Sequence, residues 1–259
     1  MKQYLDALRA VLSDGELRGN RTGIKTLSLF GLQIRMDLQN GFPLLTTKKM
    51  YFKGIVGELV WMLQGQTNIQ FLQDNGIHIW DGWADKNGDL GPVYGKQWRD
   101  WNGNDQVKTI IGQIKHDPES RRIILTNWNV AELKDMSLPP CHILAQFYVR
   151  SHHYLDCSVY QRSGDMFLGI PFDIASYAIM VHLFARWTDL LPGKLIYNIG
   201  DAHIYENHIV QVKEQLKREP RELPELHIVD NWSLDKLEIG NFIISGYKPY
   251  PTIKGEVAL

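Results

Sequence analysis

The chain has 259 residues, of which 44% are hydrophobic, so it is long enough to bury a sizeable core. Its 28 basic and 29 acidic residues leave a formal net charge of -1, which excludes the broad positive field of a dedicated nucleic-acid binder. The two cysteines exclude a disulfide framework and a cysteine-rich zinc site. With no run of membrane-spanning length, we expect a soluble, cytoplasmic protein.

The N-terminal half combines helical and strand-like patterns. Residues 4–12 carry apolar side chains at helical spacing, and 26–38 alternates like a bent strand. Residues 51–65 return to helical spacing, which predicts a largely buried helix containing one acid, Glu58. The stretch 80–101 is rich in Trp, Gly, Asp and Tyr, which is typical of a structured loop that carries function.

The C-terminal half mixes strands and helices without strict alternation. Strand-like runs occupy 121–129, 142–150, 154–163, 225–229 and 241–245. Helical patterns occupy 107–117, 174–187 and 202–218. The helix over 174–187 is apolar on nearly every side, so it belongs in the middle of the molecule. We therefore expect an α+β fold built on a sheet, with a single domain over residues 1–259.

The common glycine-rich dinucleotide, metalloprotease and phosphate-loop signatures are missing, so candidate residues come from scattered motifs. "LPPCH" places Cys141 after two prolines, with His142 beside it. A rigidly positioned thiolate near a base is what nucleophilic catalysis requires. The alternative is a small buried cysteine of the core.

Other motifs carry groups suited to a phosphate and a sugar. A phosphate dianion can be bound by arginine guanidinium groups together with a hydroxyl. The sequence offers these in Arg121, Arg122, Arg162 and Ser163. The alternative for the adjacent arginines is an ordinary solvated surface pair. In "GDAHIYENH", His203 and Tyr205 could bind sugar hydroxyls, or pack together at the start of a helix.

Taken together, the motifs resemble those of one family across essentially the whole chain. They are "RTG" (21–23), "FPLLTTKK" (42–49), "GELVWMLQGQTN" (57–68), "IWDGWADKNGDLGPVYGKQWR" (79–99), "DPESRRIILTNWN" (117–129), "LPPCH" (138–142), "QRSGDMFLGIPFDIASYA" (161–178) and "GDAHIYENH" (200–208). In this order they resemble thymidylate synthases. The resemblance implies a three-layer α+β fold, whose large twisted mixed sheet packs against its copy in a homodimer.

The resemblance also implies roles for the residues around the nucleophile. Cys141 is similar to the thiolate that adds to C6 of a pyrimidine nucleotide, making C5 nucleophilic toward the methylene carbon of methylenetetrahydrofolate. Glu58 and Tyr94 correspond to proton-transfer residues, and Asn129 and His142 to residues lining the same cavity.

Binding residues follow from the same resemblance. The phosphate site corresponds to Arg21, Arg162 and Ser163, completed by Arg121 and Arg122 of the partner subunit. His203 and Tyr205 correspond to the contacts of the ribose 3′-hydroxyl. The folate side corresponds to Lys48, Trp80, Trp83, Asp165, Leu168, Gly169, Phe172 and Leu259. No metal is expected.

One position departs from the pattern of the synthases. Asp173, within "LGIPFDIASYA", stands where they normally have an asparagine that pairs with O4 and N3-H of uracil. An ionised carboxylate would face O4 acceptor to acceptor, at a cost of about 1–3 kcal/mol. Cytosine presents the reverse edge, and a carboxyl sharing one proton with its N3 fits in a bidentate way. We therefore expect Asp173 to select dCMP, as the same aspartate does in deoxycytidylate hydroxymethylases.

The fate of the C5 methylene group stays open at this point. Hydride from the folate gives a methyl group, whereas water, activated through the Glu58 network, gives a hydroxymethyl group. Gly164 stands where a larger residue is common, which would leave room for such a water. The sequence leads us to expect a dCMP hydroxymethylase, with two alternatives: dCMP methylation, and an ordinary thymidylate synthase acting on dUMP with a protonated Asp173.

Overall fold

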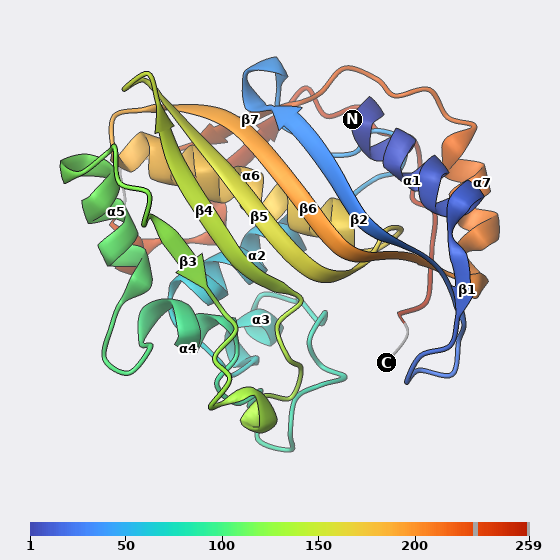
Figure 1. Ribbon diagram of the computed structural model, residues 1–259, viewed down its shortest axis with the longest axis horizontal. Helices are drawn as coiled ribbons and strands as arrows, with labels where there is room; N and C mark the ends of the chain where they lie inside the picture. Colours follow the sequence, from blue (N-terminus) through green and yellow to red (C-terminus); the bar gives the residue numbers. More distant parts are fainter. Residues whose placement is uncertain (230–232, 258–259) are drawn as a thin grey trace.

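The computed structural model describes residues 1–229 and 233–257 (Figure 1). Its centre is a six-stranded sheet in the order β1-β2-β6-β5-β4-β3. The strands are β1 (Glu16–Arg18), β2 (Thr26–Asp37), β3 (Ile124–Thr126), β4 (His142–Arg150), β5 (Tyr154–Asp165) and β6 (Leu191–Tyr205). β5 and β6 run parallel and the other neighbours antiparallel, so the predicted mixed sheet is confirmed.

Helices cover one face of this sheet. They are α1 (Lys2–Asp14), α2 (Phe52–Leu63), α3 (Gln70–Asp74), α4 (Tyr94–Arg99), α5 (Gln106–His116), α6 (Gly169–Trp187) and α7 (Ile209–Leu216). α6 packs on β5 and β6 and also contacts α2, so sheet, α6 and α2 form three layers (Figure 1). Apolar residues around the whole circumference of α6 are buried, as its sequence predicts. The α+β fold class is therefore confirmed.

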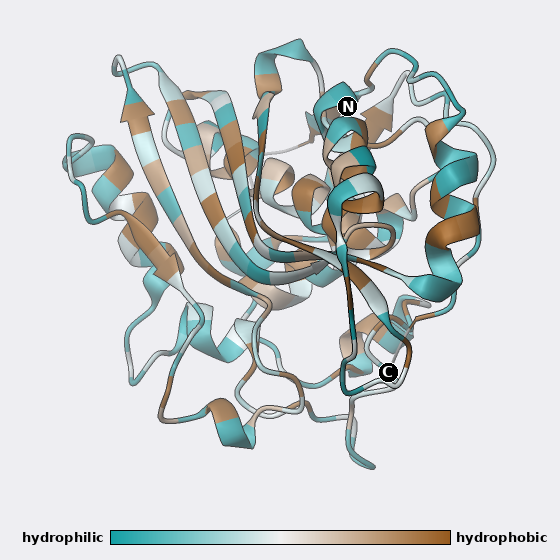
Figure 2. Cartoon of the chain, turned by 45° about the vertical axis from the view of Figure 1, so that its right-hand side comes forward, coloured by the Kyte–Doolittle hydropathy of each residue, from teal (hydrophilic) through white to brown (hydrophobic). Residues whose placement is uncertain are grey.

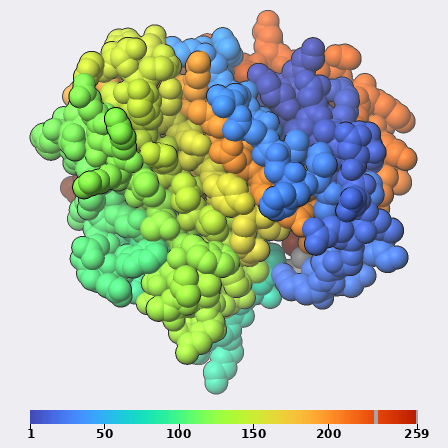
Figure 3. Space-filling view, in the orientation of Figure 1, coloured from blue at the N-terminus to red at the C-terminus, as the bar shows by residue number. Residues whose placement is uncertain are grey.

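The other face of the sheet lies open to solvent over β4 and β5. Tyr148 of β4 is 60% exposed and Tyr160 of β5 is 37% exposed. The space-filling view shows side chains of these strands at the surface, with no helix over them (Figure 3). The hydropathy colouring shows apolar segments alternating with polar ones along the strands (Figure 2). The sheet therefore offers a second, uncovered surface.

The prediction of a helix over 202–218 is wrong in its first part. Residues Leu191–Tyr205 form β6, and the helix that follows, α7, covers only Ile209–Leu216. The buried positions Leu195, Tyr197 and Ile199 alternate as in a strand. Polar and glycine residues interrupt that alternation, which hides it in the sequence. His203 consequently lies on the strand, whereas Tyr205 ends it and caps the 3-10 helix Glu206–His208, and the two rings pack edge to face with centroids 5.2 Å apart.

Smaller differences concern the boundaries of three elements. The strand predicted over 121–129 is only Ile124–Thr126, and α6 begins at Gly169, before the expected 174. The loop 80–101 contains one short helix, Tyr94–Arg99. A separate two-stranded antiparallel sheet pairs β7 (Glu225–Ile228) with β8 (Phe242–Ser245). Among the described residues, no helix is long and apolar enough to cross a membrane.

Candidate active site

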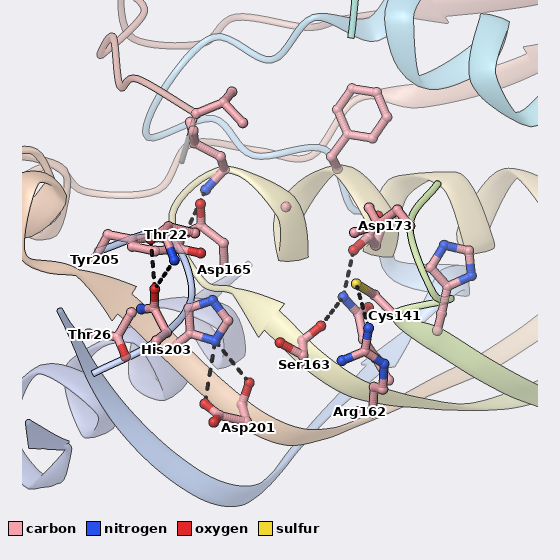
Figure 4. Close-up of a pocket in the computed structure, with 18 of the residues that line it drawn as sticks. Thr22, Thr26, Cys141, Arg162, Ser163, Asp165, Asp173, Asp201, His203 and Tyr205 are labelled. Atoms are coloured by element: carbon pink, nitrogen blue, oxygen red, sulfur yellow. Dashed lines mark hydrogen bonds and ion pairs between the residues drawn. The ribbon is translucent and has the colours of Figure 1, made fainter. Parts of the chain in front are cut away.

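A cavity of about 490 Å³ opens where β2, β5 and β6 meet the start of α6 (Figure 4). Strand register builds its floor, because side chains two residues apart share one face of a strand. β2 contributes Thr26 and Ser28, β5 contributes Gln161, Ser163 and Asp165, and β6 contributes Asp201, His203 and Tyr205. Ser28 pairs with His203 across the strands, and Ser163 with Asp201. Residues far apart in sequence thus meet at one surface.

Cys141 lies half-buried at the edge of this cavity, immediately before β4. Its backbone N–H donates to the Tyr94 hydroxyl at 2.8 Å, and Arg162 Nη2 lies 4.0 Å from Sγ. The pKa of the thiol lies above its ordinary value, because burial and the charge of Asp173 raise it by more than the charges of Arg162 and Arg21 lower it. The thiol is therefore held beside the positive charge that a thiolate needs.

Glu58 lies in the middle of α2 and is buried. Trp80 Nε1 donates to its Oε1 at 2.7 Å. Burial, reinforced by the charge of Asp173, raises the pKa of Glu58 to about 8, so this carboxyl carries a proton at neutral pH. A neutral buried carboxyl can donate a proton but is a poor base.

His142 is packed between two tyrosines next to Cys141. Its ring stacks on Tyr94 with centroids 4.2 Å apart, and Nδ1 lies 2.9 Å from the Tyr177 hydroxyl. Burial lowers the pKa of His142 to about 3, so the ring is neutral at physiological pH. It lines the cavity as an uncharged wall.

Asp173 faces the cavity from α6, close to Cys141 (Figure 4). Gln161 Nε2 donates to its Oδ2 at 2.9 Å, and the Tyr197 hydroxyl donates to Gln161 Oε1 at 2.5 Å. Gln161 Nε2 also donates to the Ser163 carbonyl at 2.9 Å, and because a carbonyl can only accept, this contact fixes which end of the glutamine amide faces the carboxyl. Burial raises the pKa of Asp173 to about 7, against the hydrogen bond from Gln161 that lowers it. Both protonation states are accessible near neutral pH.

The cationic end of the cavity contains Arg18, Arg21 and Arg162. Arg162 is held rigidly, because its Nε donates to the Pro140 carbonyl at 2.8 Å and Nη2 to the Pro139 carbonyl at 2.9 Å. Ser163 lies beside it (Figure 4). The adjacent pair Arg121 and Arg122 is exposed and lies outside the lining of the same chain's cavity.

The same cavity also has an apolar wall. Its members are Ile79, Trp80, Trp83, Leu168, Phe172 and Val257, next to Asp165 and Gly169. Trp80 and Trp83 pack edge to face with centroids 5.7 Å apart. Leu259, assigned by resemblance to this side, lies outside the described residues.

Two of the expected site residues lie behind the wall of the cavity. Lys48 donates to the Phe167 carbonyl, and its Nζ lies 3.7 Å from the centre of that ring. Asn129 is buried and donates to Glu132 Oε2 at 2.9 Å and to Gln97 Oε1 at 3.2 Å. Neither lines the cavity.

Sequence reasoning missed several residues of the cavity, including Gln161 and Asp201. Their signal is a two-residue spacing from Ser163 and His203, which becomes readable once both segments are known to be strands. Gly164 leaves no free space, since a Cβ there would lie 2.3 Å from Ile170 Cδ1. Within the described residues, no three His, Cys, Asp or Glu side chains gather as a metal-binding group.

Comparisons with known proteins agree on one family. The model of a family described as thymidylate synthase matches residues 2–259. A curated protein of Buchnera aphidicola subsp. Schizaphis graminum (strain Sg), named "Thymidylate synthase", is 51% identical over 265 residues. That alignment covers 100% of this chain and 100% of the relative.

Proposed function

Because the chain belongs to the thymidylate synthase family and is a folate-dependent one-carbon transferase, we propose that it methylates C5 of a pyrimidine deoxynucleoside monophosphate. The substrate that we put first is dUMP, in keeping with the name of the relative. Asp173 favours dCMP as a second substrate. The observation that carries the proposal is Cys141, placed beside Arg162 in a cavity that also contains Glu58 and Asp173.

Cys141 acts as the nucleophile in this proposal. Its thiolate forms a bond from Sγ to C6, and the electron pair of the C5–C6 double bond moves toward C5 and O4. Arg162, 4.0 Å from Sγ, stabilises the thiolate before attack. Methylenetetrahydrofolate, as co-substrate, would supply the one-carbon unit and the hydride that completes a methyl group; C5 would give up its proton, and Sγ would leave C6 to restore the C5–C6 double bond. Glu58, protonated at neutral pH, moves protons at the polar edge of the base.

The base is read by Asp173 in a neutral form. Gln161 donates to Oδ2 in an orientation that the Ser163 carbonyl fixes, so an asparagine at this position would have only one favourable orientation of its amide. A carboxyl has no such restriction, because its proton can sit on either oxygen. It can donate to uracil O4 and accept from N3-H, or accept from the cytosine amine and donate to N3. The site therefore suits both bases.

We put methylation ahead of the hydroxymethylation expected from the sequence. Activating a water requires a base, whereas burial raises the pKa of Glu58 to about 8 and Trp80 occupies its Oε1. Ile170 also fills the space beside Gly164 in which the sequence led us to expect room for a water. The relative named thymidylate synthase supports the ordinary synthase better than the dCMP hydroxymethylase.

The apolar wall suits the flat ring system of a folate. Trp80, Trp83 and Phe172 offer aromatic faces and edges, and Asp165 supplies an acceptor beside them. Trp80 links this wall to the base pocket through its bond to Glu58. A folate bound there would exclude water from the reacting carbon.

The active unit that we propose is a homodimer. Arg121 and Arg122 are exposed and lie outside the cavity of their own chain, and the sheet has an uncovered face with exposed tyrosines. Mixing Arg121→Ala with Cys141→Ser subunits should restore about a quarter of wild-type activity, since half of randomly formed dimers carry one intact site. No recovery on mixing would contradict the shared site.

A single buried core supports our proposal of one domain over residues 1–259. The core cluster runs without interruption from Tyr4 of α1 through α2 and α6 to Phe242 of β8. A single domain should unfold in one cooperative step. Two separate transitions in a calorimetric scan would contradict it.

The product identifies the reaction. The purified protein is incubated with dUMP and methylenetetrahydrofolate, and the nucleotide is analysed by mass spectrometry. We expect the mass of dUMP to increase by a methyl group in place of one hydrogen. A hydroxymethyl product would contradict methylation, and an unmodified nucleotide would contradict the proposed activity on dUMP.

A further inference from the structure

Asp201 lines the cavity but has no role in the chemistry described above. It lies on β6 two residues before His203, so both side chains project from the same face of the strand. Across the sheet Asp201 pairs with Ser163 of β5, and His203 pairs with Ser28 of β2. Asp201 therefore lies between the proposed phosphate and sugar contacts.

The contacts of Asp201 converge on one nitrogen of His203. His203 Nδ1 lies 3.4 Å from Asp201 Oδ1 and 3.2 Å from the Asp201 carbonyl oxygen (Figure 4). Oδ1 is shielded from solvent and makes no hydrogen bond of good geometry, so the His203 ring 3.4 Å away is the group that its charge acts on. Two acceptors facing the same nitrogen require that Nδ1 carry the proton.

The carboxylate is itself kept ionised. The hydrogen bond with His203 lowers the pKa of Asp201 below its ordinary value, and Ser28 and Arg18 act in the same direction against partial burial. Arg18 Nη1 lies 3.7 Å from Oδ2, which leaves Oδ1 for the histidine. The carboxylate is thus oriented by a cation on one side and a ring N–H on the other.

We propose that Asp201 is a positioning residue that holds the proton of His203 on Nδ1, so that Nε2 accepts a hydrogen bond from the 3′-hydroxyl of the nucleotide. This inference rests on the proposed function, because the ligand is the deoxynucleotide assigned there. Asp201 then controls sugar recognition without touching the sugar. Its contribution appears in nucleotide affinity more than in turnover.

The variant Asp201→Asn reverses the arrangement with almost no change in shape. Arg18 favours the amide oxygen at the Oδ2 position, which places the NH₂ group against His203 Nδ1. Nδ1 then faces an amide donor as well as the Asp201 carbonyl, which the variant keeps, so the Nδ1–H form loses its charged acceptor and the Nε2–H form, which cannot accept from the sugar, gains population. Asp156→Asn is the matched control, because Asp156 is another carboxylate of the sheet, paired with Arg150 at 2.8 Å outside the cavity lining.

The test measures binding of dUMP and of its 2′,3′-dideoxy analogue by calorimetry, without folate. Wild type and Asp156→Asn should bind dUMP roughly tenfold more tightly than the analogue, since the analogue leaves a buried acceptor unpaired. In Asp201→Asn the preference should fall below about threefold. An unchanged preference in Asp201→Asn would contradict the inference alone, whereas wild-type protein that binds neither nucleotide would contradict the proposed function too.

Nitrogen-15 NMR reads the tautomer directly and does not depend on catalysis. Long-range proton–nitrogen spectra of the folded protein, with the His203 signals assigned by comparison with His203→Gln, should give the Nδ1–H form in wild type. In Asp201→Asn the Nε2–H form should appear at the expense of the Nδ1–H form. A wild-type ring protonated on Nε2 would overturn the proposal.

Discussion

The two ends of the cavity handle charge in opposite ways. At the end proposed to hold the base, Glu58 is buried and Asp173 half-buried, and desolvation raises their pKa values to about 8 and about 7. At the sugar and phosphate end, Asp201 is half-buried and its pKa lies below the ordinary value, because His203 bonds it. Residues of the same chemical type thus hold a proton at one end and a charge at the other.

Burial and partners explain the difference. At the base end, carboxyls lack cationic partners, so desolvation decides and favours the neutral form. At the other end, Arg18 and a histidine N–H compensate the charge, so the ionised form persists. Neutral acids suit proton transfer and base pairing, whereas fixed charges suit recognition of a phosphate and a sugar.

The largest expected effect comes from removing the nucleophile. Cys141→Ser should lower kcat by at least about 10³-fold, because a serine hydroxyl beside Arg162 is a far weaker nucleophile. Nucleotide affinity should remain within a few-fold, since the recognition end is untouched. Steady-state kinetics and calorimetry measure the two quantities. A variant with near-normal turnover would show that Cys141 is not the nucleophile.

Glu58→Gln removes the buried proton donor without a change in shape. We expect kcat to fall by about 10²-fold. In wild type, activity should decline as pH rises through about 8, where Glu58 loses its proton, and this decline should vanish in the residual activity of the variant. A pH profile that keeps this limb would assign it to another group.

At the recognition end, Arg21→Ala should act on binding. Because Arg21 lines the cationic part of the cavity, its loss should raise KM for the nucleotide about tenfold, with a smaller fall in kcat because its charge also lowers the pKa of Cys141. The matched variant Arg21→Lys keeps the charge and should recover part of the affinity. A fall in kcat with normal KM would remove the distinction between the two ends.

The smallest expected effect is on stability. The pKa of Asp173 is about 7 in the folded protein and about 3.9 in an unfolded chain, so folding stability is lost as pH rises from about 4 through about 7. Asp173→Asn lacks this loss. Between pH 5 and pH 8 the free energy of unfolding should therefore fall more in wild type than in the variant, by on the order of 2 kcal/mol. Urea unfolding at the two pH values measures the difference, and equal losses would contradict a buried neutral Asp173.

The sequence predicted those parts of the fold where a periodic pattern is uninterrupted. α1, α2 and α6 were predicted from their apolar spacing, and β2, β4 and β5 from alternation. The strand β6 was not predicted. One reason is that Gly200 and Asp201 break the alternation just where the strand enters the cavity. The residues that disturb the pattern are there because they line the site.

The candidate site shows the same limit. Asp173 is conspicuous in the sequence, because an acid within an apolar run needs a partner. Its partner, Gln161, is not conspicuous, since the contacts of its amide with Ser163 and Tyr197 exist only in the folded sheet. Asn129 was assigned to the cavity and Lys48 to the folate side by resemblance, yet neither side chain lines the cavity. Such contacts arise only from packing.

A competition between bases tests the central claim that Asp173 reads the base as a neutral acid with a movable proton. Wild type and Asp173→Asn are each given equimolar dUMP and dCMP with methylenetetrahydrofolate, and the masses of both nucleotides are followed. We expect wild type to methylate both nucleotides. Asp173→Asn should lose activity on dCMP and keep activity on dUMP, because Gln161 fixes the asparagine amide. The same ratio of products in the two proteins would contradict it.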